Sequence, residues 1–162
     1  MTGVNRREGG FELELTADER VLLASLAQQL DTVLGEQDDP VRERLFPDAY
    51  PGDAEASTEF RRLTRHDLLS EKSEGARVLA RAVGDAETAP PRLDRIEAER
   101  VMRALADLRQ VLAERLNISA QNPEPDAENE LEPLYDWLGY LQECVVLALI
   151  AHDEDAGTLP RG

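Results

Sequence analysis

The regular spacing of leucine and valine between Asp94 and Leu116 is the feature that most restricts the fold of this chain. From Val101, apolar residues recur after four, three, four and four positions, ending at Leu116. This spacing puts one apolar stripe on an α-helix of about 3.6 residues per turn. Asp94 and Glu97 add a capping box, in which each side chain accepts a hydrogen bond from the other residue's free backbone N–H. We therefore predict a helix from Asp94 to about Leu116.

A second capping box opens an earlier helix. Thr16 and Glu19 have the same three-residue spacing, and apolar residues recur after them as far as Gly35. Threonine followed three residues later by glutamate is typical of a helix N-terminus. We predict a helix from Thr16 to about Gly35 that buries Val21, Leu22, Leu26, Leu30, Val33 and Leu34.

Two more helical segments are predicted in the middle of the chain. Asp39 and Pro40 pair a capping residue with the proline that favours the first helical position, which predicts a short helical turn over Val41–Leu45. An apolar pattern follows over residues 53–84 and can break near residues 65–67. The glycine at its end is a common helix terminator.

The last helical pattern, over Pro133–His152, is apolar around most of its circumference. Such a helix should be central in a bundle or lie at an interface. Its apolar surface exceeds what one small bundle covers, which also predicts a homodimer. The longest uninterrupted apolar run, Cys144–Ala151, is far shorter than the ~20 residues of a transmembrane helix. We therefore expect no membrane-spanning segment.

A short strand precedes the first helix. Phe11, Leu13 and Leu15 alternate with glutamates, and this period of two is typical of a β-strand with one buried face. One strand needs a partner, and we take Arg92–Leu93 as a candidate for a minimal second strand.

Together these patterns predict a mainly α fold. We expect a single-domain helical bundle of about five helices, with one or two very short strands on the N-terminal side. A chain of 162 residues is long enough for one ordinary core. The domain should span residues 11–152 and include a mobile acidic loop at 121–132, while residues 1–10 and the acidic residues 153–162 should be disordered tails.

Charge restricts the classes of partner. The formal net charge is -16, and the stretch from Leu116 to Pro160 has ten acids and no lysine or arginine. Affinity for nucleic acid comes largely from Lys and Arg near phosphates, and anionic membranes attract the same residues. We expect no strong direct binding to nucleic acid and no membrane association. A basic protein is the partner that such a surface suits.

Cys144 is the single cysteine, so the chain cannot form an internal disulfide. Residues 1–10 are polar and lack the apolar core of a signal peptide, which predicts a cytoplasmic protein. Two interpretations of Cys144 remain open. It shares a helix face with Trp137 and Leu141, where burial would make it inert, or it is a redox-sensing thiol that works through a second molecule.

Residues suited to catalysis form no recognised motif. His66 and His152 lie far apart without a ligand-spaced partner, and the chain has no glycine-rich phosphate loop or nucleophile elbow. The acids at 153–155 are either a solvated helix end or a weak site for a divalent cation. We predict that the protein is not an enzyme and has no cofactor. A divalent-metal-dependent enzyme is one alternative.

One basic cluster lies within the predicted helix over residues 53–84. It consists of Arg61, Arg62, Arg65 and His66. Like charges four residues apart cost a helix about 0.3 kcal/mol, so something anionic should offset them. Acidic side chains of this same chain and an anionic partner both remain candidates.

Two aromatic residues, Phe46 and Tyr50, lie in a segment bracketed by Pro47 and Pro51. The prolines fix the backbone, so the segment should be ordered. The aromatic rings either fill the core under this segment or form part of a partner surface.

Four motifs resemble those of one known family. Two of them are Arg44–Pro51 (Arg-Leu-Phe-Pro-Asp-Ala-Tyr-Pro) and Glu59–Thr64 (Glu-Phe-Arg-Arg-Leu-Thr). The third is Leu105–Arg109 (Leu-Ala-Asp-Leu-Arg), and the fourth is Tyr135–Glu143 (Tyr-Asp-Trp-Leu-Gly-Tyr-Leu-Gln-Glu). They resemble the actinobacterial DUF2017 family of domains of unknown function, which includes the oxidative-stress regulator AosR. The resemblance spans about residues 10–150.

This resemblance implies a non-enzymatic regulator that contacts the transcription machinery, with a stress sigma factor as the suspected partner, in a thiol-dependent way. A thiol switch within one chain needs two cysteines, and this chain has one. Gene proximity to ClpS in the family implies an alternative function as an adaptor or accessory factor of Clp proteolysis. The residues that we expect to bind a protein are Arg44, Phe46, Tyr50, Arg61, Arg62 and Arg109, and the expected redox residue is Cys144.

Overall fold

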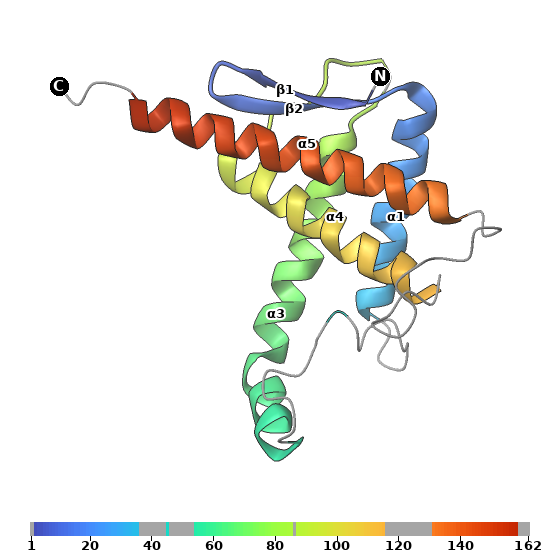
Figure 1. The fold of residues 1–162 in the computed structure, drawn as a ribbon. Coiled ribbons are helices and arrows are strands. Elements are labelled where there is room, and N and C mark those ends of the chain that lie inside the picture. Colours follow the sequence, from blue (N-terminus) through green and yellow to red (C-terminus); the bar gives the residue numbers. More distant parts are fainter. Residues whose placement is uncertain (1, 36–44, 46–53, 86, 116–130, 159–162) are drawn as a thin grey trace.

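The computed structural model describes residues 2–35, 45, 54–85, 87–115 and 131–158. Within these ranges the chain forms a two-stranded antiparallel hairpin followed by four helices (Figure 1). The predicted mainly α fold with short N-terminal strands is confirmed, but the described helices number four rather than about five. The predicted short helix at Val41–Leu45 lies outside the described residues except for Leu45, which is helical and buried.

The chain begins with a β-hairpin. β1 (Gly3–Arg7) pairs antiparallel with β2 (Gly10–Glu14). The two turn residues between them, Glu8 and Gly9, have φ angles of 50° and 79°. A type I′ turn needs positive φ at both positions and matches the natural twist of a hairpin. The expectation of a disordered tail over residues 1–10 is therefore wrong from Gly3 onward.

The alternation in β2 separates core from solvent as predicted. Phe11 and Leu13 are 1% and 2% exposed, and Val4 of β1 packs against the same core. On the edge of β2 away from β1, Phe11 exchanges two backbone hydrogen bonds with Leu93, with N···O distances of 2.9 and 2.8 Å. The predicted pairing with Leu93 is thus confirmed as a single bridge, while the main partner of β2 is β1.

Helix α1 (Ala17–Gly35) begins at its predicted capping box. The Thr16 N–H donates to the Glu19 carboxylate at 2.8 Å, and the Glu19 N–H donates to the Thr16 hydroxyl at 3.2 Å. The expected burial of Val21 and Leu22 is wrong, because they are 73% and 40% exposed. They lie to the solvent side of the stripe that packs on the core, whose members are Leu23, Leu26, Ala27, Leu30, Val33 and Leu34.

Helices α3 and α4 also agree with the sequence patterns. α3 (Ala54–Val83) is continuous through residues 65–67 and ends before Gly84, whose φ of 64° is the left-handed conformation that glycine adopts easily. α4 (Arg95–Arg115) begins at the second capping box. The Glu97 N–H donates to Asp94 at 2.7 Å, and the Asp94 N–H donates to Glu97 at 3.1 Å.

Helix α5 (Leu131–Thr158) is longer than predicted at both ends. Residues 153–158, which we expected in a disordered acidic tail, continue this helix, so that expectation is wrong for them. Of the loop predicted at 121–132, Leu131 and Glu132 belong to α5, and residues 121–130 lie outside the described residues.

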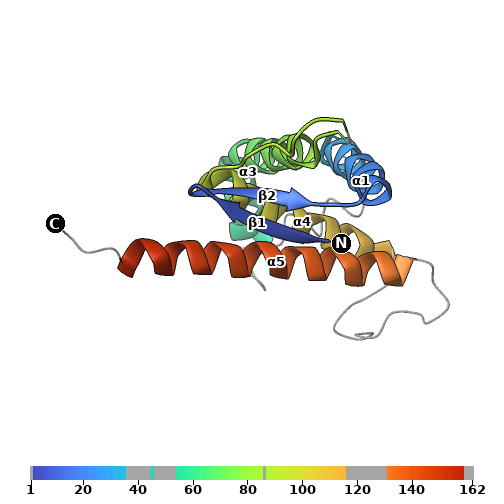
Figure 2. The ribbon, with the colours of Figure 1, turned by 90° about the horizontal axis from the view of Figure 1, so that it is seen from above.

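Helix α4 is central to the packing. It contacts α1, α3 and α5 and also β2, and the buried apolar side chains of these elements form one core cluster. α5 runs antiparallel to α4, and the hairpin lies over both helices (Figure 1). Seen from above, β1 is the strand nearer to α5 (Figure 2). This arrangement leaves one side of α5 and one edge of the hairpin next to each other.

Candidate protein-binding site

Helix α5 carries apolar side chains on two opposite sides. One side packs on the core, and its most buried residues are Leu138, Leu141 and Val145. On the other side, Tyr140, Leu147 and Ile150 are 49%, 57% and 49% exposed. The sequence predicts a helix that is central or lies at an interface, and the structure shows an apolar side that the described part of the chain leaves open to solvent.

Carboxylates accompany these apolar residues. Glu143, Glu154 and Asp136 lie four, seven and eleven positions from Leu147, so they fall on the same side of a helix with about 3.6 residues per turn. All three are exposed. α5 contains six Asp and Glu residues and no Lys or Arg. We call the exposed side formed by Asp136, Tyr140, Glu143, Leu147, Ile150 and Glu154 the outer face of α5.

A shallow groove of about 510 Å³ runs between the outer face of α5 and the hairpin. Tyr140, Cys144 and Leu147 line it on the helix, and residues 2–4 and Arg6 line it on and beside β1. The groove is therefore built from segments that lie at opposite ends of the sequence.

Two polar contacts hold β1 over α5 at the ends of this groove. The indole N–H of Trp137 donates to the hydroxyl of Thr2 at 3.0 Å. At the other end of the strand, the guanidinium of Arg6 pairs with the carboxylate of Asp155. These contacts fix the position of the strand relative to the helix and so keep the groove open along its length.

Cys144 is half-buried in the groove wall. Tyr140 lies one helical turn before Cys144, and the neighbouring thiol raises the pKa of Tyr140 above its usual range. Cys144 is therefore neither fully enclosed in the core nor fully open to solvent. Its redox role stays a prediction.

The third and fourth sequence motifs meet at Arg109. The Arg109 guanidinium lies 4.6 Å from the centre of the Tyr135 ring and donates a hydrogen bond to Gln142 at 3.0 Å. Its buried Nε has no hydrogen-bond partner among the described residues. Gly139 makes room for it, because a Cβ there would lie 3.3 Å from the guanidinium. Arg109 thus lies between α4 and α5 and not on the outer face of α5.

An ion pair between α3 and α4 is a further polar feature, which the sequence analysis missed. The Lys72 Nζ lies 2.8 Å from the Asp107 Oδ1, and the two side chains are 24% and 12% exposed. Burial raises the pKa of Asp107 and outweighs the opposing effect of Lys72. A cavity of about 290 Å³ lies beside the pair. The one available signal in the sequence is that Lys72 is the only lysine.

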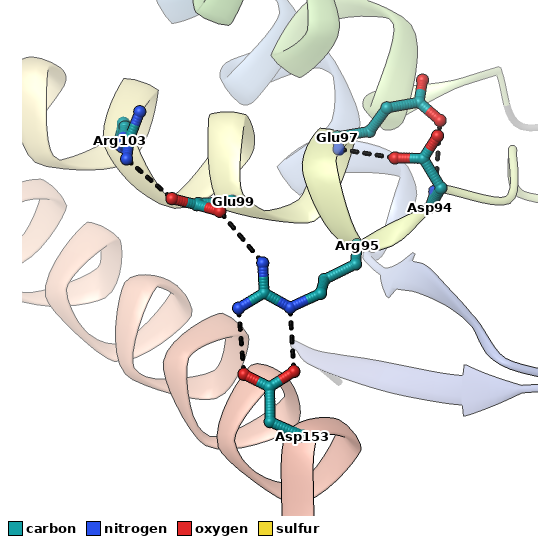
Figure 3. Close-up of polar contacts among 6 residues, drawn as sticks. All are labelled: Asp94, Arg95, Glu97, Glu99, Arg103 and Asp153. Carbon is teal, nitrogen blue, oxygen red and sulfur yellow. Dashed lines mark hydrogen bonds and ion pairs between the residues drawn. The ribbon is translucent and has the colours of Figure 1, made fainter. Parts of the chain in front are cut away.

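Asp153, near the end of α5, forms an ion pair with an arginine of α4. Asp153 accepts hydrogen bonds of 2.8 and 2.9 Å from Arg95, and these bonds lower the pKa of Asp153 (Figure 3). Arg95 also donates to Glu99, which accepts a further hydrogen bond from Arg103. Across the ranges that the structure describes, no three His, Cys, Asp or Glu side chains are placed to hold a metal ion.

The other predicted contact residues lie wholly or partly outside the description. Arg61 and Arg62 lie in α3, but their side chains are outside the description. Arg44, Phe46 and Tyr50 lie outside the described residues altogether.

Helix α5 is also long and apolar enough over Leu131–Gly157 to cross a membrane, by length and composition alone, and no other described helix meets these two criteria. Core helices of water-soluble proteins meet the same criteria. This property therefore assigns no location to the protein.

Comparison with known proteins identifies a family. The sequence model of a domain of unknown function, DUF2017, matches residues 1–149. No curated protein and no solved structure matches the chain. The family match includes the hairpin, α1, α3, α4 and most of α5, and hence every element that forms the groove. The chain therefore belongs to the DUF2017 family of domains of unknown function.

Proposed function

We propose that this protein is a non-enzymatic regulator that acts by binding another protein through the outer face of α5. The observation that supports this function is the presence of three half-exposed apolar side chains, Tyr140, Leu147 and Ile150, on one side of a helix. Apolar side chains that gather on a surface and are surrounded by polar residues are typical of protein-binding sites.

The partner that we propose is a component of the transcription machinery, and a stress sigma factor is the first candidate. The resemblance to regulators such as AosR motivates this choice. Charge is consistent with it, because proteins that bind DNA expose Lys and Arg, whereas α5 has six acids and the whole chain has a net charge of -16. Opposite charges also speed association and disfavour wrong partners. The regulator would act in the cytoplasm.

A binding experiment with purified components tests this function. RNA polymerase of the native host, with and without each of its stress sigma factors, is passed over the immobilised full-length protein. We expect one sigma factor or the polymerase itself to bind, and Leu147→Asp to weaken that binding. Val21→Asp is the matched control, because Val21 is a 73% exposed apolar residue on α1. We expect this control to bind as the wild type does.

Two other results would contradict the proposal. Binding to ClpS or to a Clp ATPase, with no transcription component bound, would replace the regulator with a proteolytic adaptor. A shift of promoter DNA by the protein alone at physiological salt would replace protein contact with direct DNA binding.

A further inference from the structure

One edge of β1 has no strand partner among the described residues. A two-residue hairpin turn makes Arg7 and Gly10 a hydrogen-bonded pair, and hydrogen-bonded and non-bonded pairs then alternate along the ladder. The backbone groups of Val4 and Arg6 therefore point away from β2. The bridge from Phe11 to Leu93 supports this alternation. Phe11 is opposite Arg6 in the ladder, and its backbone N–H and C=O also point out of the hairpin, where they bond Leu93.

This free edge lies directly beside the groove. Within the described ranges, no hydrogen bond reaches the backbone N–H or C=O of Val4 or Arg6. The groove begins at this edge and reaches the outer face of α5 at Tyr140 and Leu147. Figure 2 shows the same order, with β2, β1 and α5 following one another across the molecule. A strand added to β1 would therefore lie over the groove.

The two faces of such an added strand would meet different surroundings. The side chain of Val4 packs towards the core and that of Arg6 pairs with α5, so this face of the hairpin looks towards the helix. Every second residue of an added strand would face the same way, onto Tyr140, Cys144 and Leu147. The alternate residues would face solvent.

We propose that an extended segment of the partner protein adds to the free edge of β1 as a third strand and fills this groove. The inference rests on the proposed function, since the segment belongs to the partner protein. Backbone hydrogen bonds to Val4 and Arg6 supply affinity, and apolar side chains at every second position of the segment supply specificity.

Charge restricts the composition of the segment. Glu14 lines the groove, and Glu143 lies on the outer face of α5. The segment therefore carries Lys or Arg as well as apolar residues. A second copy of this chain fits less well, because pairing two β1 edges would bring together two α5 helices with six acids and no Lys or Arg each.

Peptide selection tests the proposal directly, because it requires only the protein itself and a peptide library. The full-length protein selects binders from a library of random peptides of about twelve residues, enough to extend along and beyond a five-residue strand. We expect the enriched peptides to have apolar residues at every second position and a net positive charge. Synthetic versions are then N-methylated at every second amide. Methylation of the alternate amides whose N–H groups face β1 should weaken binding by about tenfold or more. Methylation of the other alternate set should have little effect.

Protein variants show whether the same edge is used. Val4→Pro removes an N–H that points away from β2, so the β1–β2 ladder keeps its hydrogen bonds while the edge loses a donor. Leu147→Asp changes the groove floor without touching the hairpin, and it is the variant that tests the groove if Val4→Pro does not fold. We expect each variant to weaken peptide binding by about tenfold. Val21→Asp should bind as the wild type does.

Several results would overturn the inference. These are a library with no enriched peptide, peptides with a helical apolar spacing, equal effects of methylating the two alternate sets of amides, or a dimer of this chain that Val4→Pro dissociates. If the proposed transcription partner binds but neither Val4→Pro nor the peptide interferes, the inference fails and the proposed function stands. If the peptide binds in the groove and no transcription component binds, the proposed function fails and the inference stands.

Discussion

Arg109 and Gly139 share a narrow space between α4 and α5. A Cβ at Gly139 would lie 3.3 Å from the guanidinium, although alanine favours a helix over glycine by about 1 kcal/mol. We expect Gly139→Ala to raise the free energy of unfolding by about 1 kcal/mol in an Arg109→Ala background and by less in the wild type. Urea denaturation of the four proteins in a double-mutant cycle measures this difference. Equal gains in both backgrounds would contradict the contact.

Lys72 is the cation beside the largely buried carboxylate of Asp107. Lys72→Met takes this cation away and should lower the free energy of unfolding at neutral pH by about 1–3 kcal/mol. Burial raises the pKa of Asp107, with Lys72 opposing, so the fold favours the protonated carboxyl. Stability from this group is greatest below the ordinary pKa of 3.8 and is lost as pH rises through the raised pKa.

The loss in Lys72→Met should therefore shrink as pH falls through the raised pKa of Asp107, because a neutral carboxyl needs no cation. Urea denaturation at a series of pH values measures it. Arg77→Met is the control, since the Arg77 side chain is 68% exposed on the same helix. Its effect should stay within about 0.5 kcal/mol at every pH. A loss in Lys72→Met that did not change with pH would point to packing of the lysine stem and not to its charge.

Among the helices, α1 offers the clearest test of a local stabilising feature. Thr16→Ala removes the hydroxyl that accepts the Glu19 N–H and should lower the free energy of unfolding by about 1 kcal/mol. Thr32→Ala is a matched control within α1, because the exposed Thr32 only donates back to Gln28 and alanine suits a helix interior better. Thermal unfolding followed by helical circular dichroism measures both. Equal losses would mean that the cap contributes nothing specific.

The capping boxes also explain why some elements can be predicted from the sequence. The start of α1 depends on hydrogen bonds between residues three apart, and so does the start of α4. β1 could not be predicted in this way, because its formation depends on pairing with another strand and not on a local pattern. Gly3–Arg7 has a single apolar residue, Val4, and it becomes a strand only by pairing with β2. The burial of Val21 and Leu22 was also predicted wrongly from the sequence, because packing rather than apolar character decides which side of α1 is buried.

Only part of the candidate site could be predicted from the sequence. The apolar circumference of α5 predicts an interface, and the apolar residues that the structure shows exposed on it, such as Tyr140 and Leu147, are where we propose one. The groove itself depends on contacts between distant residues, such as the hydrogen bond between Thr2 and Trp137, which lie 135 positions apart. No local pattern in the sequence contains that information.

For the whole molecule, the salt dependence of binding distinguishes a basic partner from a second copy of this chain. Screening shortens the reach of charge from about 10 Å at about 0.1 M salt to about 3 Å at about 1 M. Binding of a basic partner should weaken over this range, because salt screens an attraction. A homodimer through α5, which the sequence predicts, would instead be strengthened, because salt screens the repulsion between acidic helices.

We therefore expect the protein to sediment as an 18.0 kDa monomer at about 0.1 M salt and to form dimers towards about 1 M. Analytical ultracentrifugation across this range measures the dimer fraction. Leu147→Asp should reduce the dimer at high salt, since it places a charge in the apolar contact, whereas Val21→Asp should not. A dimer present at low salt and lost at high salt would need attraction between opposite charges. The acidic outer face of α5 does not supply that attraction, so such a dimer would form through another surface and leave α5 free for its partner.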